Sequence, residues 1–362
     1  MQYRELPYAR TVDFCTRIFA SYGFGGEDAA AITDVLLRAD LYGIESHGIQ
    51  RLVRYHEEIT SGMVDMHAAP QLVHETPVSA VIDAQRCMGQ LAALQAMRLA
   101  IQKAKSAGIG MVAVRNSNHY GIAGYYSNMA VESDLIGVCM TNTEAICVPT
   151  HGKRAMLGTN PIALAMPADP VPFSFDAATT VVPRGKLEVY NKNGAALPDG
   201  WAVDAGGHPT RDAHEVLHNI IHKLGGGIAP LGGSEEVSGG HKGYGLAAIV
   251  DLFTGILSGG ATSNHVNVSP GRTDICHFFA ALDYGLFGDR QALRERLSVF
   301  LQELRDSDKA DGASRIYTHG EKEAERMAGR IHGTLPVNEK TWEELCRIAE
   351  ARGVDIAGLG AK

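Results

Sequence analysis

The chain has 362 residues, of which 45% are hydrophobic and 20% charged, as is typical of a soluble globular protein with one large or two medium domains. A formal net charge of −8, without any long Lys/Arg cluster, argues against nucleic acid or an anionic membrane as a partner. No stretch resembles a signal peptide or a membrane span, and the six cysteines form no CxxC pair. We therefore expect free thiols in a reducing, cytoplasmic location.

Three helices are predicted over residues 7–62. Strands and helices then alternate, with strands at 78–83, 110–115, 135–141, 161–166 and 172–176 and helices at 90–107, 121–133 and within 180–189. After a glycine-rich segment at 231–245, the pattern predicts an apolar helix reaching 258, a strand at 277–283, and helices at 289–307, 320–332 and 338–352. This order predicts an α/β fold, with residues 76–288 as the central module and residues 1–75 packing with 289–362 as a helical module.

The segment from Asp40 to Arg51 breaks a helical pattern with a polar turn. Gly43 can end the first helix in a left-handed conformation, and Ser46 and His47 follow between Gly43 and Gly48. Histidine titrates near neutral pH, and Arg51 offers a guanidinium fork suited to a carboxylate. The alternative is an ordinary turn with a capping serine and a packed histidine.

Three further polar loops follow or join predicted strands, where α/β enzymes place reactive groups. They hold His119, the pair Thr159 and Asn160, and Asp176. His119 is a candidate acid–base group or substrate contact, with helix capping as the alternative. Asp176 is a candidate for orienting a histidine.

A dinucleotide turn of the form GxGxxG is absent, because the glycines at Gly243 and Gly245 lack a third. A nucleotide site must therefore use a non-Rossmann architecture. The glycines before Lys242 offer amide groups, a helix N-terminus and a cation for a phosphate, although such glycines also serve as simple turns.

The string His214-Glu215-Val216-Leu217-His218 matches the zinc-protease pattern and predicts two imidazoles on one helix face. The candidate third ligand, His222, lies on the same helix, and three ligands in a straight row cannot converge on one tetrahedral ion. A solvated helix face is the better interpretation, so no metal is expected, and a zinc hydrolase is the alternative from another class.

Five strings occur together in one order: Ser46-His47-Gly48, Asn118-His119-Tyr120-Gly121, Leu157-Gly158-Thr159-Asn160-Pro161, Asp176-Ala177-Ala178-Thr179-Thr180 and His241-Lys242-Gly243-Tyr244-Gly245-Leu246. In this the sequence resembles the malate/L-lactate dehydrogenase family of non-Rossmann oxidoreductases. That family includes sulfolactate, ureidoglycolate and 2,3-diketogulonate oxidoreductases and a cyclic-imine reductase. The C-terminal part matches more loosely, with His319 where proline is usual.

The resemblance implies an NAD- or NADP-dependent dehydrogenase that transfers a hydride between a nicotinamide and a small 2-hydroxy or 2-oxo acid. It implies a mixed sheet with helices, a helical module built from both chain ends, and a homodimer. Malate or lactate is the expected substrate type, with sulfolactate, ureidoglycolate or a cyclic imine as alternatives. The substrate's identity and the choice of NAD or NADP stay open.

The resemblance also implies residue roles. His47 corresponds to the proton donor, with Ser46 and Asp176 as partners, although His119 matches the acid–base group of some members. Substrate contacts are expected at Arg51, Thr159 and Asn160. Cofactor contacts are expected at Thr143, Asp176, Ala177, Ala178, Thr179, His241, Lys242, Gly320 and Glu321.

Overall fold

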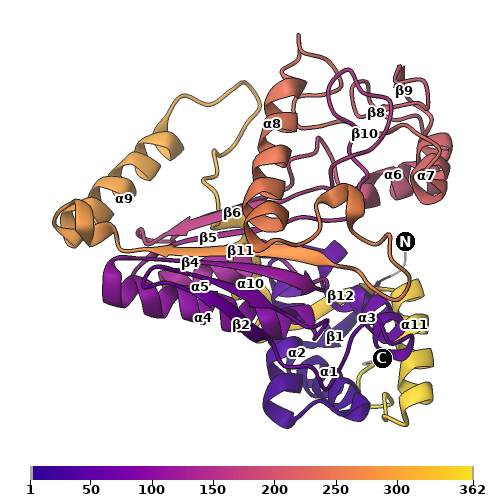
Figure 1. The fold of residues 1–362 in the computed structure, drawn as a ribbon, viewed down its shortest axis with the longest axis horizontal. Coiled ribbons are helices and arrows are strands. Elements are labelled where there is room, and N and C mark those ends of the chain that lie inside the picture. Colours follow the sequence, from indigo (N-terminus) through magenta and orange to yellow (C-terminus); the bar gives the residue numbers. More distant parts are fainter. Residues whose placement is uncertain (1–2, 361–362) are drawn as a thin grey trace.

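A computed structural model describes residues 3–360 as a mixed α/β fold (Figure 1). The α-helices are α1 (Tyr8–Tyr22), α2 (Gly26–Leu41), α3 (Leu52–Thr60), α4 (Gly89–Ala107), α5 (Ala123–Val131), α6 (Arg184–Lys192), α7 (Ala213–His222), α8 (Gly240–Asp251), α9 (Arg290–Asp306), α10 (Glu321–Arg330) and α11 (Glu339–Arg352). The strands are β1 (Tyr3–Pro7), β2 (Gln71–Glu75), β3 (Ser79–Asp83), β4 (Ile109–Ser117), β5 (Ile136–Thr141), β6 (Ile162–Met166), β7 (Phe173–Ala177), β8 (Ala202–Val203), β9 (Pro209–Thr210), β10 (Gly227–Ile228), β11 (Ile275–Leu282) and β12 (Thr334–Asn338). Short helical turns are η1 (Glu45–His47), η2 (Ile49–Arg51), η3 (Leu252–Ile256), η4 (Ser263–His265) and η5 (Tyr284–Phe287).

A seven-stranded sheet forms the centre of the molecule, in the order β2-β3-β4-β11-β5-β6-β7. Strands β3 and β4 pair in parallel, with α4 as the connection between them, while the other neighbours pair antiparallel. Helices α4 and α5 cover one face, and α8 lies over the other (Figure 1). The predicted α/β class with a mixed sheet is therefore confirmed.

Helices α4 and α5, which cover one face of the sheet, approach it very closely. A Cβ added at Gly110 in β4 would lie 2.0 Å from the carbonyl oxygen of Ala100 in α4, and one at Gly137 in β5 would lie 2.1 Å from that of Ser127 in α5. Glycine at these two positions allows the strand backbone to pack directly against the helix backbone. This close packing fixes the strand ends that carry the polar loops.

The two chain ends build a second core together. Strand β1 pairs antiparallel with β12, with Leu6 opposite Leu335. Apolar side chains of α1, α2, α3 and α11 join this pair in one buried cluster, with Phe14, Tyr55 and Leu345 among its members. The helical module built from both chain ends is thus present, and it lies beside the sheet (Figure 1).

The predicted limits of the two modules, 1–75 with 289–362 and 76–288, stay a prediction. Two observations bear on them. Strands β2 and β3 pair across the boundary, with Glu75 opposite Ala80. Helix α9 lies apart from the other C-terminal helices (Figure 1), and its Arg294 forms an ion pair with Asp169 at 2.6 Å.

The predicted helices and strands are all present, with ends shifted by a few residues. Strands β1, β2 and β12 and the small sheet of β8, β9 and β10 were not predicted. Each is short, β1 and β12 each contain a proline, and all five residues of β2 are exposed, so the sequence signal for a strand is weak at each of them. Within residues 3–360, no helix combines the length and apolar character needed to cross a membrane.

Candidate active site

The turn that carries Ser46 and His47 begins with a defined helix end. Helix α2 stops where Gly43 takes a left-handed φ of +76°. The N–H of Ile44 then donates to the carbonyl of Ala39, and that of Gly43 to the carbonyl of Asp40, as in a Schellman motif. The chain continues through η1 and η2 into α3. The predicted role of Gly43 is confirmed.

A buried carboxyl holds the second half of the same turn. Asp40 accepts a hydrogen bond from the N–H of Ile49 at 2.7 Å, and burial raises the pKa of Asp40 to about 7. A Cβ at Gly48 would lie 2.1 Å from the Asp40 carboxyl oxygen. Glycine is therefore required at position 48 for the turn to close over Asp40.

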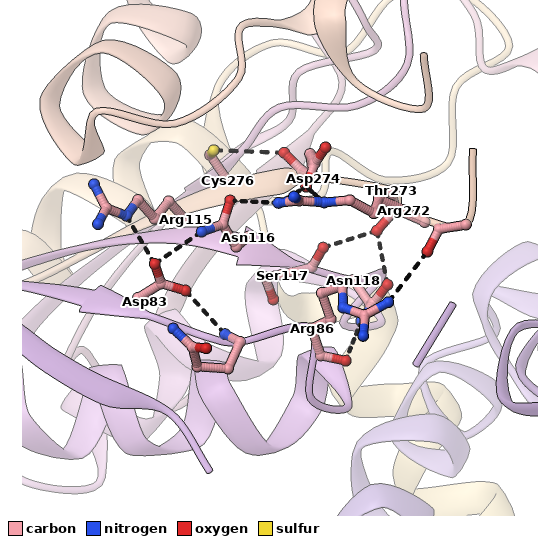
Figure 2. A network of polar contacts seen from close by, with 12 residues as sticks. Asp83, Arg86, Arg115, Asn116, Ser117, Asn118, Arg272, Thr273, Asp274 and Cys276 are labelled. Carbon is pink, nitrogen blue, oxygen red and sulfur yellow. Dashed lines mark hydrogen bonds and ion pairs between the residues drawn. The ribbon is translucent and has the colours of Figure 1, made fainter. Parts of the chain in front are cut away.

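His119 comes to this turn from the central sheet. Its loop is anchored by Asn118, whose side-chain amide donates to the carbonyls of Arg86 at 2.9 Å and Cys87 at 2.8 Å. The Asn118 side-chain oxygen accepts a hydrogen bond from Thr273 at 2.7 Å. Figure 2 shows Asn118 held between Arg86 and Thr273 in this way. The loop after β4 is thus fixed by the neighbouring loop and by the segment before β11.

The two candidate histidines stack on each other. The ring centroids of His47 and His119 are 5.7 Å apart with an interplanar angle of 26°. Ser46 Oγ lies 2.9 Å from His47 Nδ1, and the Tyr55 hydroxyl lies 2.7 Å from His119 Nδ1. Local turns from two modules therefore bring three of the predicted catalytic residues, Ser46, His47 and His119, into one cluster.

Both imidazoles are held in the neutral form. Burial, with the positive charges of Arg51 and Arg54, lowers the pKa of His47 from 6.5 to about 4. Burial also lowers the pKa of His119 well below 6.5, and Arg54 and His47 add to this shift. A neutral imidazole can accept a proton or donate its single N–H, and both functions serve acid–base chemistry at an oxygen.

Arg51 supplies positive charge beside the histidines. Its Nε donates to the carbonyl of Ser46 at 2.6 Å, which fixes the guanidinium against the turn. No carboxylate within residues 3–360 forms an ion pair with Arg51, whereas the neighbouring Arg54 is paired with Glu58 at 2.6 Å. Burial and Arg54 lower the pKa of Arg51 from 12.5. An unpaired, partly buried guanidinium is suited to binding an acid group.

A separate pocket of about 210 Å³ contains Asp176. Its walls come from the ends of β7 and α10 and from the segment after α2, and Gly320 and Lys322 are among the lining residues. Asp176 accepts a hydrogen bond from the N–H of Gly124 at 2.7 Å, and desolvation raises its pKa to about 6. Within the described residues no hydrogen bond joins Asp176 to His47, so the predicted three-residue relay stays a prediction.

The predicted contacts near the β6 end form an internal hydrogen-bond network. Thr143 Oγ1 accepts from the N–H of Thr159 at 2.9 Å, and the N–H and hydroxyl of Thr179 donate to the carbonyl of Thr159. Asn160 is fully buried, donates to Asp251 at 3.0 Å and accepts from the N–H of Thr143. Because protein groups already occupy its amide, Asn160 serves this loop structurally, and its predicted substrate contact remains untested.

The remaining predicted cofactor residues lie in three places. Ala177 and Ala178 follow Asp176 and are half-buried, while His241 and Lys242 are exposed in the first turn of α8. Glu321 is buried in the first turn of α10. There it accepts from the N–H of Thr318 at 2.7 Å and faces two arginines. Gly320, not Glu321, lines the pocket.

The zinc-like string lies on α7 with exposed histidines. The ring centroids of His214 and His218 are 6.5 Å apart, and those of His218 and His222 are 4.4 Å apart. Across residues 3–360, no group of three or more His, Cys, Asp or Glu is arranged to hold a metal ion. The zinc-hydrolase alternative has no observation in its favour.

Two residues of the site were missed by the sequence interpretation. Tyr55 was not considered as a site residue, but its hydroxyl lies 2.7 Å from His119 Nδ1. Lys322 lines the Asp176 pocket beside Gly320 and was not considered. The position of Tyr55, four residues after Arg51 and so on the same helix face, is a signal that could have drawn attention to it.

The site thus combines a stacked pair of neutral histidines with a guanidinium that has no carboxylate partner within residues 3–360, beside a sheet that lacks a dinucleotide turn. A family model described as Malate/L-lactate dehydrogenase matches residues 6–346, and the chain belongs to this family of hydroxy-acid dehydrogenases.

Named relatives agree with this membership. The chain is 45% identical to a malate dehydrogenase of Pyrococcus abyssi, over 99% of this chain and 97% of that protein. It superposes on the malate dehydrogenase of Entamoeba histolytica with a TM-score of 0.94 and 35% identity, covering 98% of this chain and all of the other. The sulfolactate dehydrogenase of Methanocaldococcus jannaschii gives a TM-score of 0.88 and 33% identity, covering 98% and 99% of the two chains.

Proposed function

We propose that the protein interconverts a small 2-hydroxy acid and its 2-oxo acid with NAD or NADP, as a malate-type dehydrogenase. The observation that carries this proposal is the unpaired guanidinium of Arg51 beside the stacked neutral rings of His47 and His119. The likeness to named malate dehydrogenases favours malate within that class.

The chemistry follows from the charges of the cluster. A nicotinamide, when bound, accepts the hydride from C2 of the hydroxy acid. As that hydride leaves, neutral His47 takes the proton of the C2 hydroxyl, and the carbonyl forms. In the reverse direction, the substrate's negative charge near the ring stabilises protonated His47, which returns the proton. Arg51 holds the C1 carboxylate and so fixes which face of C2 is presented.

Two further arginines lie near Arg51, and both already have an acidic partner. Arg54 and Arg184 lie close enough to contribute to the lowered pKa of Arg51. Each is paired with a glutamate, at 2.6 and 3.0 Å respectively. The preference for malate over lactate therefore rests on the likeness to named malate dehydrogenases, with sulfolactate as the second candidate.

The residues of the Asp176 pocket fit part of a dinucleotide. The pocket offers hydroxyl and carboxylate groups suited to a ribose, and Lys322 and the first turn of α10 suited to a phosphate. A Cβ at Gly320 would lie 2.9 Å from the carbonyl of Pro172, so glycine allows this part of the pocket wall to pack closely against the segment leading into β7. The pocket volume of about 210 Å³ is smaller than the roughly 300–1,000 Å³ of a pocket that encloses a whole ligand. The pocket would therefore hold only part of the dinucleotide, and we propose that the rest extends toward Thr143 and Lys242.

The test of this proposal is a panel of oxaloacetate, pyruvate, sulfopyruvate and oxalurate, each with NADH and with NADPH. We expect the highest kcat/KM with oxaloacetate. A higher value with sulfopyruvate would reassign the substrate. Absence of turnover with every acid and both cofactors would refute the proposal.

The lowered pKa of His47 predicts an unusual pH dependence. A histidine base with a pKa of 6.5 would lose roughly ten-fold in kcat/KM between pH 7.5 and 5.5, because protonation removes the base. With a pKa of about 4, His47 stays neutral over this range. We therefore expect kcat/KM for malate oxidation to stay flat from pH 7.5 to 5.5, where malate remains largely ionised. A ten-fold loss over this interval would contradict the prediction.

A homodimer is proposed from an apolar face. The exposed side of α8 and η3 carries large apolar side chains, namely Leu246, Ile249, Leu252, Ile256 and Leu257. A contiguous patch of this kind on a monomer marks an interface, and a second copy of the chain is the occupant that a symmetric contact requires.

Five of the six cysteines are buried and all six are free, which supports the proposed cytoplasmic location.

Sedimentation velocity tests the dimer. The wild type should sediment as a dimer and Ile256→Glu as a monomer, because a buried unpaired carboxylate opposes association. Val299→Glu replaces an equally exposed apolar residue on α9 and is the matched control. A monomeric wild type, or loss of the dimer only in the α9 control, would contradict the assignment.

A further inference from the structure

Two hydrogen-bond donors point at the same nitrogen of His119. The backbone N–H of Gly121 lies 3.4 Å from Nδ1, and the Tyr55 hydroxyl lies 2.7 Å from it. A backbone N–H can only donate, so Nδ1 must be an acceptor and carries no proton. A neutral imidazole then has its single proton on Nε2.

The position of Gly121 depends on its being glycine. Its φ is +93°, a left-handed value that glycine adopts readily and that directs the chain after it into α5, and a Cβ here would lie 2.9 Å from Val35. The loop conformation is thus selected by sequence. In this conformation the Gly121 N–H faces Nδ1 of His119, and this contact does not depend on the protonation of the surrounding groups.

The Tyr55 hydroxyl stays protonated and can therefore donate a hydrogen bond. It is fully buried in the helical core, its ring centroid lies 6.5 Å from that of Phe19, and burial raises the pKa of its hydroxyl above the ordinary value of 10. The hydroxyl therefore keeps its proton at physiological pH and directs it at His119.

His47 has no such constraint. Its Nδ1 faces Ser46 Oγ at 2.9 Å, and a hydroxyl can donate or accept. His47 can therefore gain and lose a proton without losing this contact, whereas a proton on His119 Nδ1 would face two other donors, the Gly121 N–H and the Tyr55 hydroxyl. The two stacked rings are consequently suited to different tasks.

We propose that Tyr55 is a positioning residue: with the Gly121 N–H it fixes His119 as the Nε2–H tautomer, so that His119 is a neutral hydrogen-bond donor to the substrate's C2 oxygen while His47 transfers the proton. The inference rests on the proposed function, since it assigns roles within that reaction. His119 forms and breaks no covalent bond in it. It stabilises charge on the oxygen as the hydride moves.

Nitrogen NMR of histidine-labelled protein reads the tautomer without any turnover. In the wild type, His119 Nδ1 should give the signal of an unprotonated nitrogen and Nε2 that of a protonated one. Tyr55→Phe should raise the Nδ1–H population. Tyr22→Phe removes a comparable contact, from Tyr22 Oη to His56 Nδ1 at 2.5 Å, and should leave His119 unchanged. A proton on Nδ1 of His119 in the wild type would overturn the inference, even if Tyr55→Phe failed to fold.

Kinetic measurements on variants distinguish His119 as a hydrogen-bond donor from His119 as a general base. Loss of a preorganised donor should cost about 10²–10³-fold in kcat in His119→Ala. A glutamine amide supplies an N–H but cannot take a proton, so His119→Gln should be at least about ten-fold more active than His119→Ala. Tyr55→Phe should lose about five-fold in kcat, the equivalent of one neutral hydrogen bond, with KM for the cofactor unchanged.

Equal inactivity of His119→Gln and His119→Ala, together with an active His47→Gln, would make His119 the base and overturn the assignment. A wild-type enzyme inert toward every acid tested would instead refute the proposed function. The NMR result would still decide the tautomer in that case, so the two failures are distinguishable.

Discussion

His47→Ala is expected to lower kcat for malate oxidation by at least about 10²-fold, because in the proposed roles His119 carries its proton on Nε2 and cannot take that of the hydroxyl. Cofactor affinity should change little, since His47 does not line the Asp176 pocket. Stopped-flow measurement of NADH formation and fluorescence titration of NADH binding give the two quantities separately.

A control separates loss of the base from loss of structure. Added imidazole should restore part of the turnover of His47→Ala, because it can enter the space left by the ring, and it should not restore His119→Ala. Turnover of His47→Ala at the wild-type rate, with loss in His119→Ala alone, would transfer the proton role to His119.

Arg51→Gln is expected to lower kcat/KM for malate by about 10²–10³-fold, because it removes charge-assisted hydrogen bonds to the acid group. The loss should appear mainly in KM, since the acid group is bound in both the ground and transition states. Arg51→Lys keeps the charge but loses the fork, so its kcat/KM should fall between that of Arg51→Gln and that of the wild type.

The exposed Arg98 on α4 forms no ion pair within the described residues, and Arg98→Gln is the matched control. It should leave KM for malate unchanged. An Arg51→Gln enzyme with the wild-type KM, and with its loss confined to kcat, would show that Arg51 does not hold the acid group.

The main elements could be predicted because their patterns are local. Apolar residues at helical spacing mark α2 and α3, and short apolar runs between glycines mark β4 and β5. Strands β1 and β12 were not predicted, because their stability comes from pairing between segments more than 300 residues apart, with Tyr3 opposite Asn338. A five-residue segment carries no sign of a partner so distant in sequence.

The site was predictable residue by residue but not in its geometry. Glycines around His47 and the polar loop of His119 indicate reactive turns, and the structure stacks these two rings. The sequence could not distinguish the two histidines, because the difference lies in Tyr55 and in the direction of the Gly121 N–H. Asn160 resembles a ligand-binding residue in sequence, yet buried protein groups satisfy its amide.

The most direct test of these roles is a crystal structure with NADH and oxamate, an unreactive analogue of a 2-oxo acid. We expect the oxamate carboxylate to lie on the Arg51 guanidinium, and its amide carbonyl oxygen to lie within about 2.6–3.2 Å of both the His47 ring and His119 Nε2. Oxamate bound away from Arg51, or a His47 ring turned into the apolar core of the helical module, would contradict these roles.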